Sequence, residues 1–178
     1  IICDGKEISS AKAGDEVMII TNQTPFYGES GGQIGDLGDM TSSTGKIWIN
    51  DTQRKLGDLI VHSGRVEEGT FKTGDSVHLA VEDVRRDIIK ASHSATHLLH
   101  KVLRNQLGAH VTQKGSLVAP ARLRFDFSHP KALTPQELQE IELEVNYKIR
   151  QNTPVNVKVM TPDEAQKEGA MALFGEKY

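Results

Sequence analysis

The stretch "VRRDIIKASHSATHLLHKVLRNQLG", from Val84 to Gly108, marks the point where the hydrophobic periodicity of the chain changes. Its apolar residues recur at helical spacing, at positions 84, 88, 91, 95, 98 and 102. Glycine often follows the last turn of a helix, and Gly108 stands at that place. The pattern therefore predicts one helix from Val84 to about Gly108.

A different pattern precedes this helix. Between Asp15 and Asp83, clusters of Gly, Asp and Ser separate four short β-rich runs, "EVMIIT", "KIWINDT", "DLIVHSG" and "DSVHLAVED". Such runs are typical of short strands joined by turns. We interpret residues 1–83 as an all-β domain, a small barrel or sandwich, that carries a glycine-rich loop.

The pattern after the helix predicts an α+β arrangement. "HVTQKGSLVAP" and "ARLRFDFSH" are expected to be paired strands. Thr134, Pro135 and Glu137 form a complete helix start, with an N-cap, a proline at the first position and a glutamate three residues beyond the cap. We expect that helix to end near Asn152, followed by a strand at "VNVKVM" and a short helix from Pro162. The predicted fold class is α+β, with a small N-terminal β-barrel over residues 1–83 and an α+β domain over residues 84–178.

The composition is that of a soluble globular protein. The chain has 178 residues, of which 37% are hydrophobic and 25% charged, enough for one sizeable core or two small ones. The formal net charge of −3 argues against a protein that coats nucleic acid in general, although it is compatible with a local basic face. Cys3 is the single cysteine, which rules out an internal disulfide, and no apolar run reaches the roughly 18 residues of a membrane span. We expect a cytoplasmic protein and, because the sequence starts without Met, a piece of a longer chain.

"SHSATHLLH", Ser92–His100, carries two histidines one helical turn apart. Residues i and i+4 lie on the same face of a helix, so His93 and His97 are placed to present two imidazoles to one metal ion. Both lie opposite the predicted apolar stripe. The alternative is a solvent-exposed helix face that happens to contain histidines. Ser94 stands where the H-E-x-x-H helix of metalloproteases has its glutamate, so peptide hydrolysis by that route is not supported.

The second conspicuous stretch is "TPFYGESGGQIGDLGD", Thr24–Asp39. Clustered glycines allow positive φ angles and a close approach of a ligand to the main chain. The pair Gly31-Gly32 directly before Gln33 is suited to aim that amide into a cleft. No Gly-Lys-Ser/Thr follows, so the stretch is not a nucleotide P-loop. The alternative is a glycine-rich hairpin connection.

Five motifs in this order closely resemble the editing region of alanyl-tRNA synthetases of the bacterial type: "TPFYGESGGQIGD", "SHSATHLLH", "VTQKGSL", "RLRFDFSH" and "GAMALFGEKY". The resemblance covers essentially the whole chain. The first motif is shared with free-standing alanyl-tRNA editing proteins, and the H-x-x-x-H helix also resembles the editing domain of threonyl-tRNA synthetases. The α+β domain would then be an editing domain of the threonyl/alanyl-tRNA synthetase type.

The resemblance implies hydrolysis of serine or glycine wrongly esterified to alanine tRNA, within a parent enzyme that attaches alanine to that tRNA with ATP. Such hydrolysis is needed for a physical reason. A pocket shaped for alanine cannot exclude glycine by size, and it rejects serine, which adds a hydroxyl, only weakly. A free-standing editing deacylase is an alternative source of such a segment.

Roles follow residue by residue from the resemblance. The family's H-x-x-x-H pair falls on His93 and His97 as zinc ligands, and its Gly-Gly-Gln falls on positions 31–33, with Gln33 expected in the same cleft as His97. Their polarity and nearness in the sequence, and not the resemblance, make Thr96, Thr112 and Gln113 candidates for sensing the hydroxyl of serine. The alternative for positions 112 and 113 is a strand residue that faces solvent.

The zinc site implied by the resemblance is incomplete in this sequence. The family adds a Cys-x-x-x-His motif after the "FGEKY" region, and the sequence stops at Tyr178 before any such motif. Cys3 lies in the other half and has no histidine four residues on. We expect half a zinc site and little hydrolytic activity in this segment by itself.

The expected partners are alanine tRNA and the rest of the synthetase chain. Candidates for contacts with the tRNA backbone, each with a solvated surface charge as the alternative, are Lys90, Arg104, Lys114, Arg122 and Arg124. Two hypotheses follow: a zinc-associated aminoacyl-tRNA ester hydrolase, or a tRNA-binding module without chemistry of its own.

Overall fold

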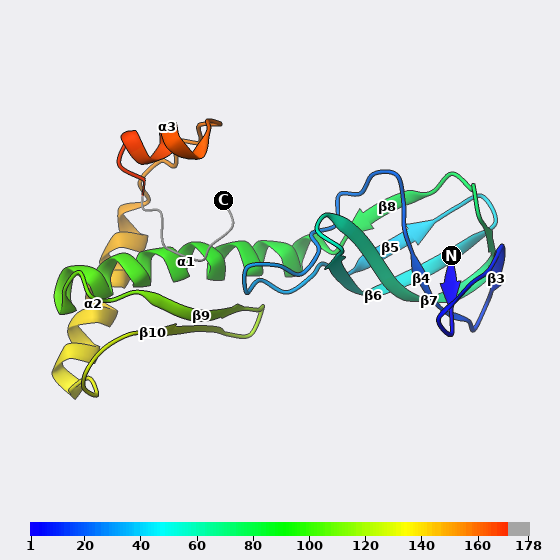
Figure 1. Cartoon of the computed structure of the whole chain (residues 1–178). Helices are drawn as coiled ribbons and strands as arrows, with labels where there is room; N and C mark the ends of the chain where they lie inside the picture. The colour runs from blue at the N-terminus through cyan, green and yellow to red at the C-terminus, as the bar shows by residue number, and fades with distance from the viewer. Residues whose placement is uncertain (171–178) are drawn as a thin grey trace. The chain divides into compact units, whose positions relative to one another are not determined.

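The computed structural model describes residues 1–170 and shows a mixed α+β protein (Figure 1). Its elements are, in chain order, β1 (Ile2–Cys3), β2 (Lys6–Glu7), β3 (Ser10–Lys12), β4 (Glu16–Ile19), β5 (Gly38–Thr41), β6 (Gly45–Lys55), β7 (Leu59–Lys72), β8 (His78–Val81), α1 (Asp83–Leu107), β9 (Gln113–Val118), β10 (Leu123–Phe127), α2 (Pro135–Gln151) and α3 (Pro162–Lys167). The four β-rich runs predicted before the long helix are confirmed as β4, β6, β7 and β8. Sequence reasoning missed β5 and the short strands β1 to β3.

The strands before α1 pair in an antiparallel sheet. Their order is β2-β1-β4-β7-β6-β5-β8, and β3 pairs in addition with β7. The longest ladder joins β6 and β7, with register shifts after Lys46 and after Ile49. A closed barrel needs hydrogen bonds between its first and last strands. Among residues 1–170 the path stays open at β2 and β8, so the predicted small barrel is not supported.

Alternating side chains of this sheet form its hydrophobic core. In β4, Val17 and Ile19 are buried while their neighbours are exposed, as expected for a strand with one face on a core. Met40, Ile47 and Ile49 are completely buried in the same cluster. Burial of these apolar side chains is the main source of stability for this part of the chain.

The chain divides into two compact units, each described by itself. The first consists of Ile1–Thr96 and Gly115–Asp126, and the second of His97–Lys114 and the residues from Phe127 onward. Helix α1 contributes to both, because the boundary falls between Thr96 and His97. β9 and β10 pair with each other, as predicted, and are joined by residues 119–122.

The long helix is confirmed, and its buried face agrees only in part with the predicted stripe. Gly108 follows the last turn with φ +116° and donates its N–H to Arg104 O at 3.1 Å. Val84 and Ile88 of the predicted apolar stripe are 73% and 45% exposed. The buried side chains of α1 are Ile89, Thr96, His100, Val102 and Leu103. Val102 of the predicted stripe is buried, as expected. The buried face also includes Ile89 and Leu103, and it includes polar Thr96 and His100, which an apolar count cannot register.

Helix α2 starts as predicted. The Thr134 hydroxyl accepts the N–H of Glu137 at 3.2 Å, and the Glu137 carboxylate accepts the N–H of Thr134 at 2.7 Å. Thr161 and Glu164 repeat this capping box at α3, the expected short helix.

The strand predicted at "VNVKVM" is wrong. Residues 153–161 have no regular secondary structure, and Val155, Val157 and Val159 are 85% exposed or more. Alternating valines favour a strand only where a neighbouring strand supplies hydrogen bonds. Within the described chain no strand pairs with this segment.

Over residues 1–170, no helix combines the length and the apolar character that a bilayer crossing requires.

Candidate functional site

The glycine-rich loop, residues 24–37, is held against β9 by backbone hydrogen bonds. Val118 donates its N–H to Gly32 O at 2.7 Å, and Ile34 donates its N–H to Val118 O at 3.2 Å, which makes a parallel bridge at Gln33. Gly32 has φ +84°, and a Cβ there would lie 2.6 Å from the backbone oxygen of Ser116. Glycine is therefore required at this position by conformation and by close packing. The loop is not a hairpin between β4 and β5, which are not neighbours in the sheet, but the hairpin interpretation holds within the loop: Gly31 and Gly32, with φ +58° and +84°, form a tight turn closed by an antiparallel bridge between Ser30 and Gln33.

This bridge places Gln33 beside α1. Gln33 Oε1 lies 2.6 Å from His93 Nδ1, and both side chains are half-buried. An amide oxygen only accepts hydrogen bonds, so Nδ1 carries the proton and donates it. In the neutral imidazole the lone pair is then on Nε2, the atom that binds a metal or takes a proton from water.

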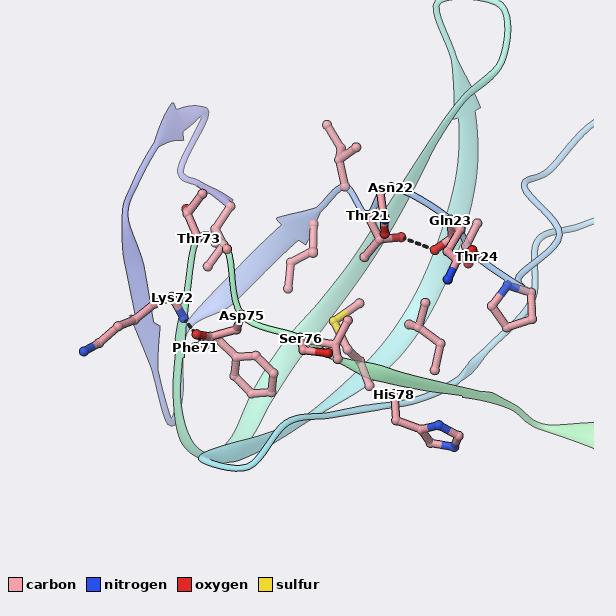
Figure 2. A pocket seen from close by; sticks show the side chains of 18 residues that line it. Thr21, Asn22, Gln23, Thr24, Phe71, Lys72, Thr73, Asp75, Ser76 and His78 are labelled. Carbon is pink, nitrogen blue, oxygen red and sulfur yellow. Dashed lines mark hydrogen bonds between the residues drawn. The ribbon is translucent and has the colours of Figure 1, made fainter.

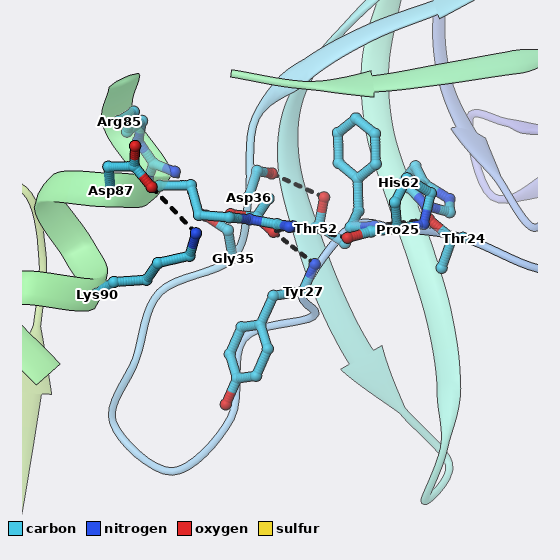
Figure 3. A network of polar contacts seen from close by, with 12 residues as sticks. Thr24, Pro25, Tyr27, Gly35, Asp36, Thr52, His62, Arg85, Asp87 and Lys90 are labelled. Carbon is cyan, nitrogen blue, oxygen red and sulfur yellow. Dashed lines mark hydrogen bonds and ion pairs between the residues drawn. The ribbon is translucent and has the colours of Figure 1, made fainter. Parts of the chain in front are cut away.

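Two arginines at the start of α1 also bind the glycine-rich loop. Figure 3 shows this network of polar contacts, with Pro25, Gly35 and Asp36 of the loop labelled. Arg85 Nη1 donates to Gly35 O at 2.9 Å. Arg86 Nη2 donates to Pro25 O at 2.6 Å and forms an ion pair with Asp36 Oδ2. Asp36 is only 1% exposed, and a buried carboxylate requires such partners.

His62 is completely buried beneath the start of the loop. Its Nδ1 lies 3.0 Å from Ile19 O and therefore donates, whereas Nε2 accepts from Thr24 Oγ1 at 2.8 Å. Burial lowers the pKa of His62, partly opposed by the hydrogen bond to the Ile19 carbonyl. A neutral imidazole with both nitrogens engaged has a structural role.

The two threonines predicted in the site use their hydroxyls locally. Thr96, 7% exposed, donates to Ser92 O at 2.9 Å, one turn back in its own helix. Thr112 Oγ1 lies 2.8 Å from Ser128 Oγ, which also accepts the Thr112 N–H at 3.0 Å.

The six predicted site residues divide between the units. Gln33, His93 and Thr96 belong to the first unit, and the structure brings Gln33 and His93 into direct contact. His97, Thr112 and Gln113 belong to the second. His97 is exposed on α1 one turn after His93, and Gln113 is half-buried at the start of β9.

The basic residues proposed for tRNA contact differ in their surroundings. Arg104 Nη1 donates to Val111 O at 2.8 Å, which gives this side chain a structural role within the second unit. Lys90 pairs with Asp87 at 3.0 Å, and Arg124 Nε pairs with Asp126 at 3.1 Å. The two others, both exposed, are Lys114 and Arg122.

The described residues do not make a zinc site by themselves. Counting only the part of the chain that the structure describes, no group of three or more His, Cys, Asp or Glu is placed to hold a metal ion. His93 and His97 supply two imidazoles, whereas zinc sites use at least three protein ligands.

A groove of about 770 Å³ lies elsewhere in the first unit, between residues 19–25 and residues 71–79 (Figure 2). Its lining combines apolar side chains, such as Met40 and Phe71, with exposed polar ones, such as Asn22 and Ser76. None of the six predicted site residues lines it. The candidate site is at Gln33 and His93 and not in this groove, because the imidazole of His93 can take a proton or bind a metal.

Sequence reasoning missed Arg85, Arg86 and Asp36. The available signal was slight: an aspartate three residues after Gln33 and two consecutive arginines in the first turn of the predicted helix. A charged residue in a sequence predicts a solvated position unless its partner is known.

Comparisons with known proteins show which proteins this chain resembles. The family described as tRNA synthetases class II (A) matches residues 1–85. An alanine–tRNA ligase of Rhizorhabdus wittichii is 60% identical over the whole chain, and one of Sphingopyxis alaskensis is 59% identical over the whole chain. The chain is thus similar, from end to end, to one segment of alanine–tRNA ligases. A third such ligase, from Gluconobacter oxydans, is 59% identical over 97% of the chain. The chain spans about a fifth of the length of these curated relatives, since the match covers 20% of each.

These relatives carry the name alanine–tRNA ligase, which denotes an aminoacyl-tRNA synthetase. The motif "GAMALFGEKY" continues to Tyr178, and its part from residue 171 lies outside the described residues.

Proposed function

We propose that this chain is the editing segment of an alanine–tRNA ligase and takes part in hydrolysis of serine or glycine mischarged on alanine tRNA. The observation that carries the proposal is the 2.6 Å contact between Gln33 and His93, which joins the two motifs of the sequence that have no other common purpose. Similarity to alanine–tRNA ligases over the whole chain supports it. The parent enzyme would attach alanine to the same tRNA with ATP.

The residues of the chain prepare one imidazole for this reaction. Gln33 fixes the tautomer of His93 and so leaves the lone pair of the neutral ring on Nε2. Such a nitrogen accepts a proton from an attacking water or serves as one ligand of a metal. Zinc is part of the proposal as a cofactor, with His93 and His97 as two of its ligands. Because the described residues offer no third ligand, we derive no step through the metal.

The proposal is tested by deacylation in an intact alanine–tRNA ligase that contains this segment. We expect Gln33→Ala to slow the release of serine from Ser-tRNA about 10- to 100-fold, because His93 loses the partner that orients it. Attachment of alanine should be unchanged. Gln139→Ala, an exposed glutamine of α2, is the matched control and should behave as wild type.

A wild-type rate of serine release in Gln33→Ala would contradict the assigned role. If the intact enzyme binds tRNA but releases no serine, and His93→Ala changes neither property, the segment is a tRNA-binding module without chemistry.

A further inference from the structure

We propose that Asp36 and Arg86 are positioning residues that hold Gln33 Oε1 against His93 Nδ1. The inference rests on the proposed hydrolytic function, because it explains how His93 is prepared for that reaction. Asp36 and Arg86 act through Gln33, and the structural argument has three steps.

Asp36 closes the loop segment that carries Gln33. Its N–H donates to Tyr27 O at 2.9 Å, and its carboxylate accepts the N–H of Tyr27 at 2.6 Å. Inside this ring, the backbone N–H groups of Ser30 and Gln33 each donate to the other's carbonyl, at 3.1 and 3.0 Å. Asp36 is therefore one of the contacts that fix segment 27–36, beside the backbone hydrogen bonds of the loop to Val118.

Arg86 connects this segment to α1. Its guanidinium pairs with the Asp36 carboxylate and also reaches Pro25 O at 2.6 Å. The side chains are 26% and 2% exposed, for Arg86 and Asp36 respectively, so solvent screens the pair only partly. A guanidinium with two separate acceptors restrains direction as well as distance, which a lysine does not.

Two cross-links join the same two segments. Asp36–Arg86 lies near the start of α1, and Gln33–His93 lies seven residues further along the helix, a rise of about 10.5 Å on the same face. Asp36 and Gln33 are three residues apart, and three residues of chain reach at most about 10 Å. The first cross-link, together with the bridge between Gln33 and Val118, thereby restrains where the second can form.

The test follows the tautomer of His93, which a merely structural role of Arg86 would leave unchanged. Long-range ¹H–¹⁵N spectra of the imidazoles are recorded on the 178-residue chain at about pH 8, where histidine is neutral, with a metal chelator present. His93→Gln identifies the signal. We expect the Nδ1–H tautomer in the wild type, a shift towards the Nε2–H tautomer in Arg86→Gln, and partial recovery in Arg86→Lys.

Arg65→Gln is the matched control, because it breaks an exposed ion pair with Glu16, 3.9 Å long, far along the sequence from the loop. It should leave the His93 spectrum unchanged. An unchanged tautomer ratio in folded Arg86→Gln overturns the inference. If circular dichroism shows that Arg86→Gln does not fold, Asp36→Asn is measured in its place, with the same expected shift and the same contradicting result.

A kinetic measurement separates this inference from the proposed function. In an intact alanine–tRNA ligase, Arg86→Gln should lower kcat for serine release by about tenfold or more with KM unchanged, because misplacement of a reacting group affects the chemical step. If the wild type releases no serine while Arg86→Gln still shifts the tautomer, the proposed function fails and the positioning contact stands. If the wild type is active and Arg86→Gln changes neither kcat nor tautomer, the positioning inference fails alone.

Discussion

His62 is a side chain whose ionisation depends on its burial. It is completely buried, its Nδ1–H donates to Ile19 O, and its Nε2 accepts from Thr24. A second proton would need a charged ring in an apolar site and would turn the Nε2 acceptor into a donor facing the Thr24 hydroxyl. Burial therefore lowers the pKa of His62 below its ordinary value of 6.5.

The lowered pKa of His62 predicts a loss of stability in mild acid. Below pH 6.5 the unfolded chain binds this proton while the folded chain does not, so the contribution of His62 to the free energy of unfolding is complete above that pH. It falls by about 1.4 kcal/mol per pH unit until the folded-state pKa is reached. Urea unfolding between about pH 7.5 and pH 5 should show this slope.

The variant His62→Gln is the control for that slope. It removes the titrating group, so the free energy of unfolding of the variant should depend less on pH over the same range. Equal slopes for wild type and His62→Gln would mean that another group is responsible.

At the scale of elements, α1 and α2 show two different sources of helix stability. α1 buries five side chains, whereas Ile141 is the one buried residue of α2 in the described structure. Leu138, Leu143 and Tyr147 of α2 are each more than half exposed. Where packing contributes little, the capping box and the local sequence contribute a larger share. The same capping box acts on the Glu137 carboxyl group, because the hydrogen bonds that this group accepts from Thr134 lower its pKa.

Removal of the Thr134 hydroxyl should destabilise α2. Thr134→Ala leaves the Glu137 N–H without its acceptor, and we expect a loss of about 1 kcal/mol in the free energy of unfolding. Chemical unfolding followed by circular dichroism measures it. Thr153→Ala, an exposed threonine beyond the other end of the helix, should change stability by at most a few tenths of a kcal/mol. Equal effects of the two substitutions would show that the cap does not limit the stability of α2.

At the scale of the whole molecule, α1 belongs to both compact units and carries one predicted metal ligand in each. His93 lies before the boundary, in contact with the glycine-rich loop, and His97 lies after it on an exposed turn. Metal affinity comes from several deprotonated ligands held together at once, and two imidazoles are too few for a zinc site.

We therefore predict that the 178-residue chain holds zinc weakly. After dialysis, metal analysis should find well under one zinc per chain, and His97→Ala should change that little. In an intact alanine–tRNA ligase that contains the segment, zinc is expected to be retained and lost on His97→Ala. One tightly bound zinc in the isolated chain, held by His93, His97 and a third residue already present, would contradict the prediction.

The sequence by itself determined the local elements. Period-two runs gave β4, β6, β7 and β8, helical periodicity gave α1, and the capping box at Thr134 gave the start of α2. These features depend on neighbours within a few residues, so the physics that forms them is present in the local sequence. The order of the motifs also predicted the similarity to alanine–tRNA ligases that the comparisons show.

Only the tertiary structure decided which groups meet across long separations. Asp36 and Arg86 are 50 residues apart, and Gln33 and His93 are 60 apart. Hydrophobic periodicity does not predict such pairs, because burial of a charge becomes favourable only when the fold brings its partner from elsewhere in the chain. The same reason explains why the stripe of α1 was only partly right and why no strand forms at residues 155–160. The face a helix buries, and the strand an apolar run becomes, depend on the neighbours that the fold brings to them.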